Sequence, residues 1–410
     1  MKYTIYSPDK LISASVLLPA SKSISNRALI LKALSKSSFA IENLSDSDDT
    51  KVMIAAFSNN NCEINVGAAG TSMRFLTAYL SQLKGETHII TGSERMKNRP
   101  IKILVEALQK LGANIEYLEK EGFPPLKIRG TELTGGSIVL NGGVSSQYIS
   151  ALMMIAPAMT KGLTLQLEGN VISKPYIYMT CRMLLDFGVQ VHWENNIIRI
   201  NPQKFHPASY VVENDWSAAS YWYEILALSS HNAVIELPGL CRNSVQGDSK
   251  IAELFESLGI STQFTESGVR LQKNNIIASK FVYDFVNEPD MAQTFAVSCC
   301  LLNLPFRFTG LQSLKIKETD RIVALKKELK KLGYLISDYE NSIIEWNGEC
   351  CETNENQVIE TYEDHRMAMA FAPAVLRLEK ISINEPEVVS KSYPNYWKDL
   401  KSAGFVLFHS

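Results

Sequence analysis

Apolar and polar positions along the chain repeat one pattern at long range. The end of an amphipathic helix is followed by a bulky apolar residue, a glycine and an alternating segment typical of a strand. The pattern occurs at residues 105–117, 182–193, 252–264, 326–339 and 399–408. Its glycines, spaced by 71 to 76 residues, are Gly112, Gly188, Gly259, Gly333 and Gly404. Glycine after a helix is the expected left-handed cap, so each copy predicts a helix–turn–strand junction.

The near-constant spacing favours about six copies of a unit of roughly 70 residues, each with two helices and several short strands. A degenerate first copy lies at residues 53–66, where Asn-rich residues replace the glycine. Short alternating strands, as at residues 136–142 and 163–169, indicate an α/β or α+β fold rather than a helical bundle. Six units in 410 residues suggest two domains of three units each. Unrelated helix–strand junctions of an α/β protein are the alternative explanation.

Composition excludes several classes of protein. The chain has 41 Lys and Arg against 43 Asp and Glu, so its net charge of −2 favours neither nucleic acid nor membrane as a partner. Seven cysteines without CxxC spacing indicate a reduced protein without structural zinc. The first ten residues contain no apolar signal region, and the longest apolar runs, such as residues 151–159, are too short to span a bilayer. We expect a soluble, cytoplasmic monomer.

Residues that packing cannot explain occur at the starts of predicted helices. In the first of these, Ser21, Ser23 and Ser25 are crowded together with Lys22 and Arg27. Serine hydroxyls can cap a helix start, but cations are unfavourable at the positive end of a helix dipole. A bound anion would make this arrangement favourable, because free N–H groups and basic side chains together bind phosphate or carboxylate.

Similar residues mark eight further predicted helix starts. They are Gly70, Thr71 and Arg74; Arg95, Lys97 and Arg99; Ser145, Ser146 and Gln147; Ser173 and Lys174; Asp290; Lys317, Glu318 and Arg321; Asp364, His365 and Arg366; and Lys391. Each group alone has an ordinary explanation, such as a helix cap at Ser145, a capping box at residues 317–321 or a structural His365. Their co-occurrence supports a shared anion-binding pocket, to which several helix starts point.

These motifs also occur in an order that resembles a known family. The segments are SKSISNRAL, AGTSMR, TGSERMKNRPI, VSSQYISALMM, SKPYI, RNSVQGD, EPDMAQT, IKETDR, EDHRMAM and KSYPNYW, between residues 19 and 397. Together they resemble the 5-enolpyruvylshikimate-3-phosphate synthase (3-phosphoshikimate 1-carboxyvinyltransferase) family. The resemblance implies a two-domain, inside-out α/β barrel with three βαβαββ repeats in each domain and an active site in the interdomain cleft. One domain would be residues 21–213, and the other would join residues 1–20 to 214–410.

The implied reaction transfers the enolpyruvyl group of phosphoenolpyruvate to the 5-hydroxyl of shikimate 3-phosphate, releasing phosphate, in the shikimate pathway to chorismate and the aromatic amino acids. No metal or cofactor is expected. The residues implied for shikimate 3-phosphate are Lys22, Ser23, Arg27, Ser145, Ser146, Gln147, Ser173, Asp290, Ser313 and Lys317. Those implied for phosphoenolpyruvate are Lys22, Gly70, Arg95, Gln147, Arg321, Arg366 and Lys391.

The implied chemistry moves two protons, one off the 5-hydroxyl and one onto the methylene carbon of phosphoenolpyruvate. Asp290 is the expected base and Glu318 an expected proton donor, while Lys22 and Lys391 stabilise charge or share the proton transfer. A carboxylate among cations is usually acidified, so the donor role requires a raised pKa or proton sharing.

Some features depart from the family pattern. Ala20, Ala68 and Ser313 replace residues usual in the family, and the stretch from Asp49 to Gly70 is short, as though a hairpin were missing. A sister transferase acting on UDP-N-acetylglucosamine is one alternative. It usually carries a cysteine before its Arg-Pro, and residues 91–100 contain none. A non-catalytic anion-binding relative is the second alternative, and the two expected catalytic carboxylates argue against it.

Overall fold

The computed structural model describes residues 1–7, 12–58, 62–230, 232–353 and 357–409. The Asn-rich part of the degenerate copy, residues 59–61, therefore lies outside the described residues. The chain forms two compact units. The split unit joins Met1–Pro19 to Glu213–Ser410, and the continuous unit is Ala20–Val212.

Five four-stranded sheets account for most of the strands in the described residues, and each contains one parallel pair followed by two antiparallel pairs. The continuous unit has β4 (Glu63–Asn65), β5 (Thr87–Thr91), β7 (Leu126–Arg129) and β6 (Asn114–Tyr117), and a second sheet of β8 (Gly136–Asn141), β9 (Leu163–Glu168), β11 (Ile197–Ile200) and β10 (His192–Glu194). One sheet order used five times is the structural counterpart of the repeat in the sequence.

The split unit contains the other three four-stranded sheets. They are β2 (Ser13–Ser15), β13 (Val234–Pro238), β15 (Gly268–Lys273) and β14 (Ile260–Phe264); β16 (Phe281–Asp284), β17 (Phe306–Thr309), β19 (Ile343–Trp346) and β18 (Ser337–Tyr339); and β20 (Val358–Ile359), β21 (Ile381–Asn384), β1 (Lys2–Tyr6) and β22 (Val406–His409). In the last sheet β1 pairs antiparallel with both β21 and β22. The first strand of the chain thus lies beside the last, which explains why this unit is split in sequence.

The sixth sheet differs from the other five. It consists of β3 (Ile41–Glu42) and β12 (Tyr210–Val211), which pair in parallel over two residues of each strand. Within the described residues this sheet lacks the antiparallel hairpin of the others, since α2 follows soon after β3. The expectation of several strands in every copy is therefore wrong for this one.

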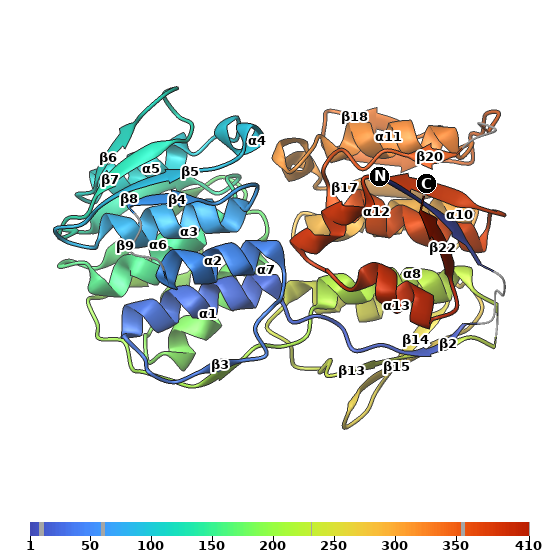
Figure 1. Cartoon of the computed structure of the whole chain (residues 1–410), viewed down its shortest axis with the longest axis horizontal. Coiled ribbons are helices and arrows are strands. Elements are labelled where there is room, and N and C mark those ends of the chain that lie inside the picture. Colours follow the sequence, from blue (N-terminus) through green and yellow to red (C-terminus); the bar gives the residue numbers. More distant parts are fainter. Residues whose placement is uncertain (8–11, 59–61, 231, 354–356, 410) are drawn as a thin grey trace. The chain divides into compact units, whose positions relative to one another are not determined.

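The helices of each unit pack together in the interior. The continuous unit contains α1 (Lys22–Ser35), α2 (Asp48–Ser58), α3 (Gly70–Ser81), α4 (Glu94–Lys97), α5 (Lys102–Lys110), α6 (Ser146–Ile155) and α7 (Lys174–Asp186). The split unit contains α8 (Trp216–Leu228), α9 (Ile251–Leu254), α10 (Ala292–Leu301), α11 (Arg321–Lys331), α12 (His365–Phe371) and α13 (Tyr396–Ser402). Figure 1 shows α1, α2 and α3 side by side, and they are in contact. Every residue of α10 is buried, as expected for a helix whose residues are apolar or small apart from Gln293.

The predicted glycine junctions are confirmed. The five repeat glycines have φ values of +105° (Gly112), +79° (Gly188), +82° (Gly259), +95° (Gly333) and +97° (Gly404). Each follows a helical segment, which is the 3₁₀ helix η3 (Phe255–Leu258) for Gly259, and precedes a strand of one of the four-stranded sheets. A residue in the left-handed conformation ends the helix and turns the chain toward the strand that follows. Glycine is favoured at this position because it adopts a positive φ without steric cost.

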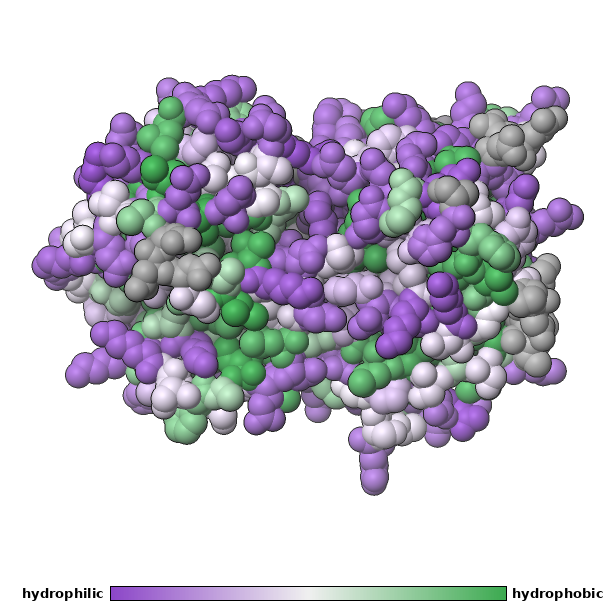
Figure 2. Space-filling view, in the orientation of Figure 1, coloured by the Kyte–Doolittle hydropathy of each residue, from purple (hydrophilic) through white to green (hydrophobic). Residues whose placement is uncertain are grey.

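The surface is mainly hydrophilic on the face that Figure 2 shows, with smaller apolar areas between the polar side chains. Phe408 on β22, for example, is 58% exposed. Among the described residues, no helix has the length and apolar character needed to cross a membrane.

Candidate active site residues

The split unit brings the predicted acidic and basic residues together around Arg321, the first residue of α11. Its side chain is almost fully buried and its guanidinium contacts three carboxylates. Nε donates to Asp364 at 2.7 Å, Nη1 to Asp290 at 2.8 Å and Nη2 to Glu318 at 2.9 Å. We call Asp290, Lys317, Glu318, Arg321, Asp364 and Arg366 the charged cluster. Burial alone would lower the pKa of Arg321, but the three carboxylates raise it above its ordinary value.

Asp290, in the 3₁₀ helix η4 (Pro289–Met291), is the acidic centre of the charged cluster. Its Oδ1 lies 2.8 Å from Arg321 and 3.2 Å from Lys317, and its Oδ2 lies 3.1 Å from Arg366. Burial opposes ionisation, but the three cations hold the pKa of Asp290 well below its usual range. The carboxylate is therefore ionised, as a base must be, although a low pKa makes it a weak proton acceptor while all three cations contact it.

The start of α12 positions two further cations. Asp364 caps this helix by accepting from the backbone N–H of Arg366 at 2.9 Å. The Arg366 guanidinium then reaches α8, where its Nη1 donates to the Tyr221 hydroxyl at 3.3 Å. Lys391, the last residue of η7 (Pro386–Lys391), donates from Nζ to the carbonyl of Glu363 at 3.2 Å. Six predicted site residues of the split unit thus lie within or beside one network.

Ser313 is the exception among the predicted residues of the split unit. It lies half-buried in η5 (Gln312–Ile316), four residues before Lys317. Among the described residues, no hydrogen bond joins its side chain to the charged cluster. Its role as a binding residue therefore stays a prediction.

In the continuous unit, four helices begin without a side-chain cap among the described residues, and three of them, α1, α3 and α7, carry predicted site residues at their starts. The N-cap residues are Ser21 for α1, Ala69 for α3 and Ser173 for α7. The expected serine cap at α1 is therefore wrong, although the side chain of Ser21 is buried. Ser173 has a φ of +53°, a left-handed conformation that is uncommon for serine. Open N–H groups at these three helix starts are suited to binding anions.

The start of α6 is different, and its ordinary explanation is confirmed. Ser145 accepts from the backbone N–H of Gln147 at 3.3 Å, which is a helix cap. Ser146 follows it and is buried. The Gln147 side chain donates from Nε2 to the hydroxyl of Thr71 at 3.2 Å. This contact joins the starts of α6 and α3, as convergence of helix starts requires.

Arg27, in the second turn of α1, is a buried cation. It donates to the hydroxyls of Thr180 and Ser150 at 2.9 and 3.0 Å and to the carbonyl of Ser23 at 2.9 Å. The guanidinium also lies over the Phe75 ring, 5.2 Å from its centroid. Among the described residues these partners are neutral, and burial lowers the pKa of Arg27 to about 10. A buried cation without a carboxylate is costly, so an anion nearby would stabilise it.

Lys22 and Gly70 occupy the first positions of α1 and α3. The Lys22 ammonium lies 3.5 Å from the carboxylate of Asp49 on α2. A methyl group on Gly70 would lie 2.6 Å from Nη1 of Arg99 and 3.0 Å from Nη1 of Arg74. A side chain at position 70 would displace at least one of these guanidinium groups, which together line the α3 start with positive charge. Arg95 lies half-buried in α4, four residues before Arg99.

Sequence reasoning missed the neutral partners that hold these cations. Three of these partners, Ser150, Thr180 and Tyr221, lie within helices whose sequences are otherwise typical of apolar or amphipathic helices. The one available signal was a hydroxyl in such a helix, since a buried hydroxyl requires a hydrogen-bond partner. Which partner it contacts depends on packing between helices.

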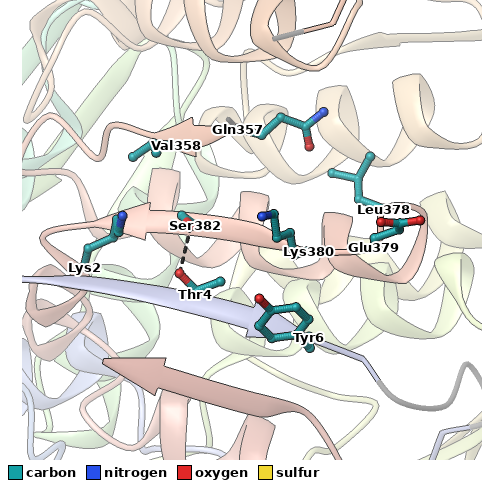
Figure 3. A pocket seen from close by; sticks show the side chains of 9 residues that line it. All are labelled: Lys2, Thr4, Tyr6, Gln357, Val358, Leu378, Glu379, Lys380 and Ser382. Carbon is teal, nitrogen blue, oxygen red and sulfur yellow. Dashed lines mark hydrogen bonds between the residues drawn. The ribbon is translucent and has the colours of Figure 1, made fainter. Parts of the chain in front are cut away.

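A hollow of about 620 Å³ lies elsewhere in the split unit, over one face of the sheet β20–β21–β1–β22 (Figure 3). Its lining includes Lys2, Lys380 and the hydrogen-bonded hydroxyls of Thr4 and Ser382, 2.9 Å apart. It contains no predicted site residue, and we assign it no role in catalysis. In the part of the chain that the structure describes, no cluster of three or more His, Cys, Asp or Glu residues is arranged to bind a metal ion.

The chain is similar in sequence to known proteins. The family model described as EPSP synthase (3-phosphoshikimate 1-carboxyvinyltransferase) matches residues 7–59 and 54–400. A protein of Bacteroides fragilis (strain YCH46) named 3-phosphoshikimate 1-carboxyvinyltransferase is 58% identical over 406 residues, covering 99% of this chain and 98% of that protein. One of the same name from Vibrio cholerae serotype O1 (strain M66-2) is 35% identical over 423 residues, covering 95% and 96%.

The fold is also similar to solved structures. The structure of EPSP synthase from Acinetobacter baumannii superposes with a TM-score of 0.78 at 21% identity and covers 100% of both chains. At this identity the likeness shows a shared fold, and the sequence relatives carry the family assignment.

Proposed function

Because the chain belongs to the EPSP synthase family, we propose that it transfers the enolpyruvyl group of phosphoenolpyruvate to the 5-hydroxyl of shikimate 3-phosphate, releasing phosphate. This reaction belongs to the shikimate pathway, which leads to chorismate and the aromatic amino acids. The observation that carries the proposal is the charged cluster, in which Asp290 contacts three cations and Arg321 contacts three carboxylates. An anionic substrate can replace such internal carboxylates as the partner of the arginines.

Shikimate 3-phosphate is the proposed ligand of the continuous unit. The uncapped starts of α1 and α7 and the uncompensated charge of Arg27 support an anion there. Arg27 already donates to protein oxygens through all three nitrogens, so its contribution is electrostatic attraction as well as fixing the α1 start. The proposed residues are Lys22, Ser23, Arg27, Ser145, Ser146, Gln147 and Ser173, with Asp290, Ser313 and Lys317 from the split unit.

Phosphoenolpyruvate, with one carboxylate and one phosphate, is the proposed ligand of the arginines. Arg321 and Arg366 present planar guanidinium groups, which bind such anions through paired hydrogen bonds. Lys391 lies beside them, next to the start of α12. Lys22, Gly70, Arg95 and Gln147 are the proposed contribution of the continuous unit. Both units then serve one pair of substrates.

The chemistry starts with attack of the 5-hydroxyl oxygen on C2 of phosphoenolpyruvate. Asp290 takes the hydroxyl proton, and the methylene carbon gains a proton from Glu318, with Lys22 and Lys391 stabilising charge or sharing the transfer. Loss of a proton from the resulting methyl group then expels phosphate and restores the double bond. When substrate anions occupy Lys317, Arg321 and Arg366, less positive charge acts on Asp290, so its pKa rises and it becomes a better base.

The proposal also covers the cellular location and the oligomeric state of the protein. We expect a cytoplasmic monomer, and the seven free cysteines, typical of a reducing compartment, support the cytoplasmic location. Light scattering after gel filtration tests the oligomeric state.

The proposed function is tested by phosphate release from phosphoenolpyruvate with the purified protein. Release that depends on shikimate 3-phosphate supports it. Release with UDP-N-acetylglucosamine instead would identify the sister transferase, and binding of both substrates without release would identify a non-catalytic relative. Small-angle scattering with and without both substrates tests whether ligands draw the two units together, as lid and domain closure does in other enzymes.

A further inference from the structure

Asp248 is a buried carboxyl group of the split unit that the proposed chemistry does not use. It lies in the 3₁₀ helix η2 (Gly247–Lys250), and only 4% of the residue is exposed. Its Oδ2 accepts from the hydroxyl of Ser217 on α8. Its Oδ1 is also buried, and no described residue gives that atom a hydrogen bond. An unpartnered carboxyl oxygen in the interior is costly, so its surroundings must favour it in some other way.

The position of Asp248 relative to the charged cluster follows from α8. Ser217, which contacts Asp248, and Tyr221, which contacts Arg366, are four residues apart on this helix. Residues at this spacing share one helix face about 6 Å apart, so Asp248 and Arg366 contact neighbouring points of the same face. The charge of Arg366 acts to lower the pKa of Asp248, and that of Asp290 acts to raise it. The pKa of Asp248 therefore depends on the charges of both members of the Asp290–Arg366 pair.

We propose that Asp248 is a positioning residue whose charge sets how strongly Arg366 is available to the carboxylate of phosphoenolpyruvate. With a neutral Asp248, the guanidinium is shared between Asp290 and the substrate. With an ionised Asp248, the guanidinium is attracted toward η2 and competes less well for the substrate. The inference rests on the proposed function, because it takes Arg366 as a ligand of phosphoenolpyruvate.

Asp248 changes its charge near neutral pH, so its effect on Arg366 is expected to depend on pH in that range. Burial raises its pKa to about 7, and the carboxylates of Asp290 and Asp215 add to this effect, while Arg366 and the Ser217 hydroxyl oppose it. Lys250, on the same short helix as Asp248, pairs with Glu253 on the adjoining α9. Affinity for phosphoenolpyruvate therefore decreases as the pH rises through neutrality, beyond any change due to ionisation of the substrate itself.

The central test compares Asp248→Asn with the unmodified protein between pH 5.5 and 8.5. Asn keeps the size and removes the charge. The ratio of KM for phosphoenolpyruvate, unmodified over variant, is expected near one at pH 5.5 and roughly tenfold at pH 8.5, as for a linkage of one pKa unit. A ratio that stays constant over this range overturns the inference, even if the variant is slower, because a purely structural role has no such pH dependence.

A second variant keeps the test independent of how Asp248→Asn folds. Ser217→Ala removes the hydrogen bond that lowers the pKa of Asp248. The midpoint of the KM change is then expected to move to higher pH, and an unmoved midpoint overturns the inference.

Calorimetry separates this inference from the proposed function. Reciprocal linkage requires that phosphoenolpyruvate binding at pH 7 raises the pKa of Asp248, so the unmodified protein takes up more protons than Asp248→Asn. Titrations in buffers of different ionisation enthalpy measure this uptake without turnover. Equal uptake by both proteins overturns the inference. Failure of the unmodified protein to release phosphate with shikimate 3-phosphate overturns the proposed function alone.

Discussion

Asp364 Oδ2 accepts a hydrogen bond of 2.7 Å from Nε of Arg321, and both side chains are buried. Asp364 also caps α12 through the N–H of Arg366. One carboxylate therefore fixes a cation on its own helix and another at the start of α11. This relationship explains how two arginines 45 residues apart in sequence are held in one network.

Asp364→Ala is expected to destabilise the split unit by about 3–5 kcal/mol, because it removes both the fully buried carboxylate partner of Arg321 and the cap of α12. Unfolding in urea, followed by tryptophan fluorescence, measures the free energy. Four of the five tryptophans, at positions 216, 222, 346 and 397, belong to this unit. Asp320→Ala is the matched control, since Asp320 only caps α11 by accepting from Val323 at 3.2 Å and should cost about 1 kcal/mol. Equal losses in the two variants would contradict the importance of the buried pair.

Asp290→Asn is expected to lower kcat by about 10²- to 10⁴-fold, the usual contribution of a general base. Binding of phosphoenolpyruvate should not weaken, because Lys317, Arg321 and Arg366 lose a competing carboxylate. Phosphate release gives kcat, and calorimetry gives the affinity. Asp284→Asn, at the exposed end of β16, is the control and should behave like the unmodified protein. Near-normal turnover of Asp290→Asn would remove this residue as the base.

Gly70→Ala is expected to raise KM for phosphoenolpyruvate by about 10- to 100-fold, a loss of about 1.4–2.8 kcal/mol in binding free energy. The new methyl group would meet Arg99 Nη1 at 2.6 Å and displace a flexible guanidinium from the start of α3. Because the displaced group is the end of a side chain, the melting temperature should change little. KM for shikimate 3-phosphate is the internal control. An unchanged KM for phosphoenolpyruvate would show that the α3 start does not contact it.

The fold was predictable where local chemistry repeats. A glycine after an amphipathic helix has a physical reason at every copy, and all five adopt the left-handed conformation. The pairing of β1 with β21 and β22 was not predictable from local patterns, because the partners lie about 380 and about 400 residues away in sequence. The two-stranded sheet of β3 and β12 was missed for the same reason.

The predicted charged residues of the split unit were found by motif, and five of them meet in the charged cluster with Asp364. Their neutral partners were not found. Arg27 is held by Ser150 and Thr180, which are 123 and 153 residues away in sequence, and no pattern of spacing indicates such contacts. Asp248 belongs to a recognised motif, but its position beside the charged cluster depends on how η2 packs against α8.

The last prediction concerns Glu224, a fully buried residue in α8 to which no described residue gives a hydrogen bond. Burial raises the pKa of Glu224 well above its ordinary value. The unfolded chain therefore loses this proton at lower pH than the folded protein does. Where only the folded protein keeps the proton, its free energy of unfolding decreases as the pH rises.

Glu224→Gln should abolish this dependence, because glutamine stays neutral. The variant and the unmodified protein should unfold at similar urea concentrations near pH 4.5, below the raised pKa. As the pH increases, the unmodified protein should become progressively less stable than the variant, by about 1.4 kcal/mol for each unit separating the folded and unfolded pKa values. Glu266→Gln, an exposed change in the same unit, is the control. If Glu224 is neutral in the folded protein, the difference in unfolding free energy between the two proteins must increase with pH. A difference that is independent of pH would therefore mean that Glu224 is ionised in the folded protein.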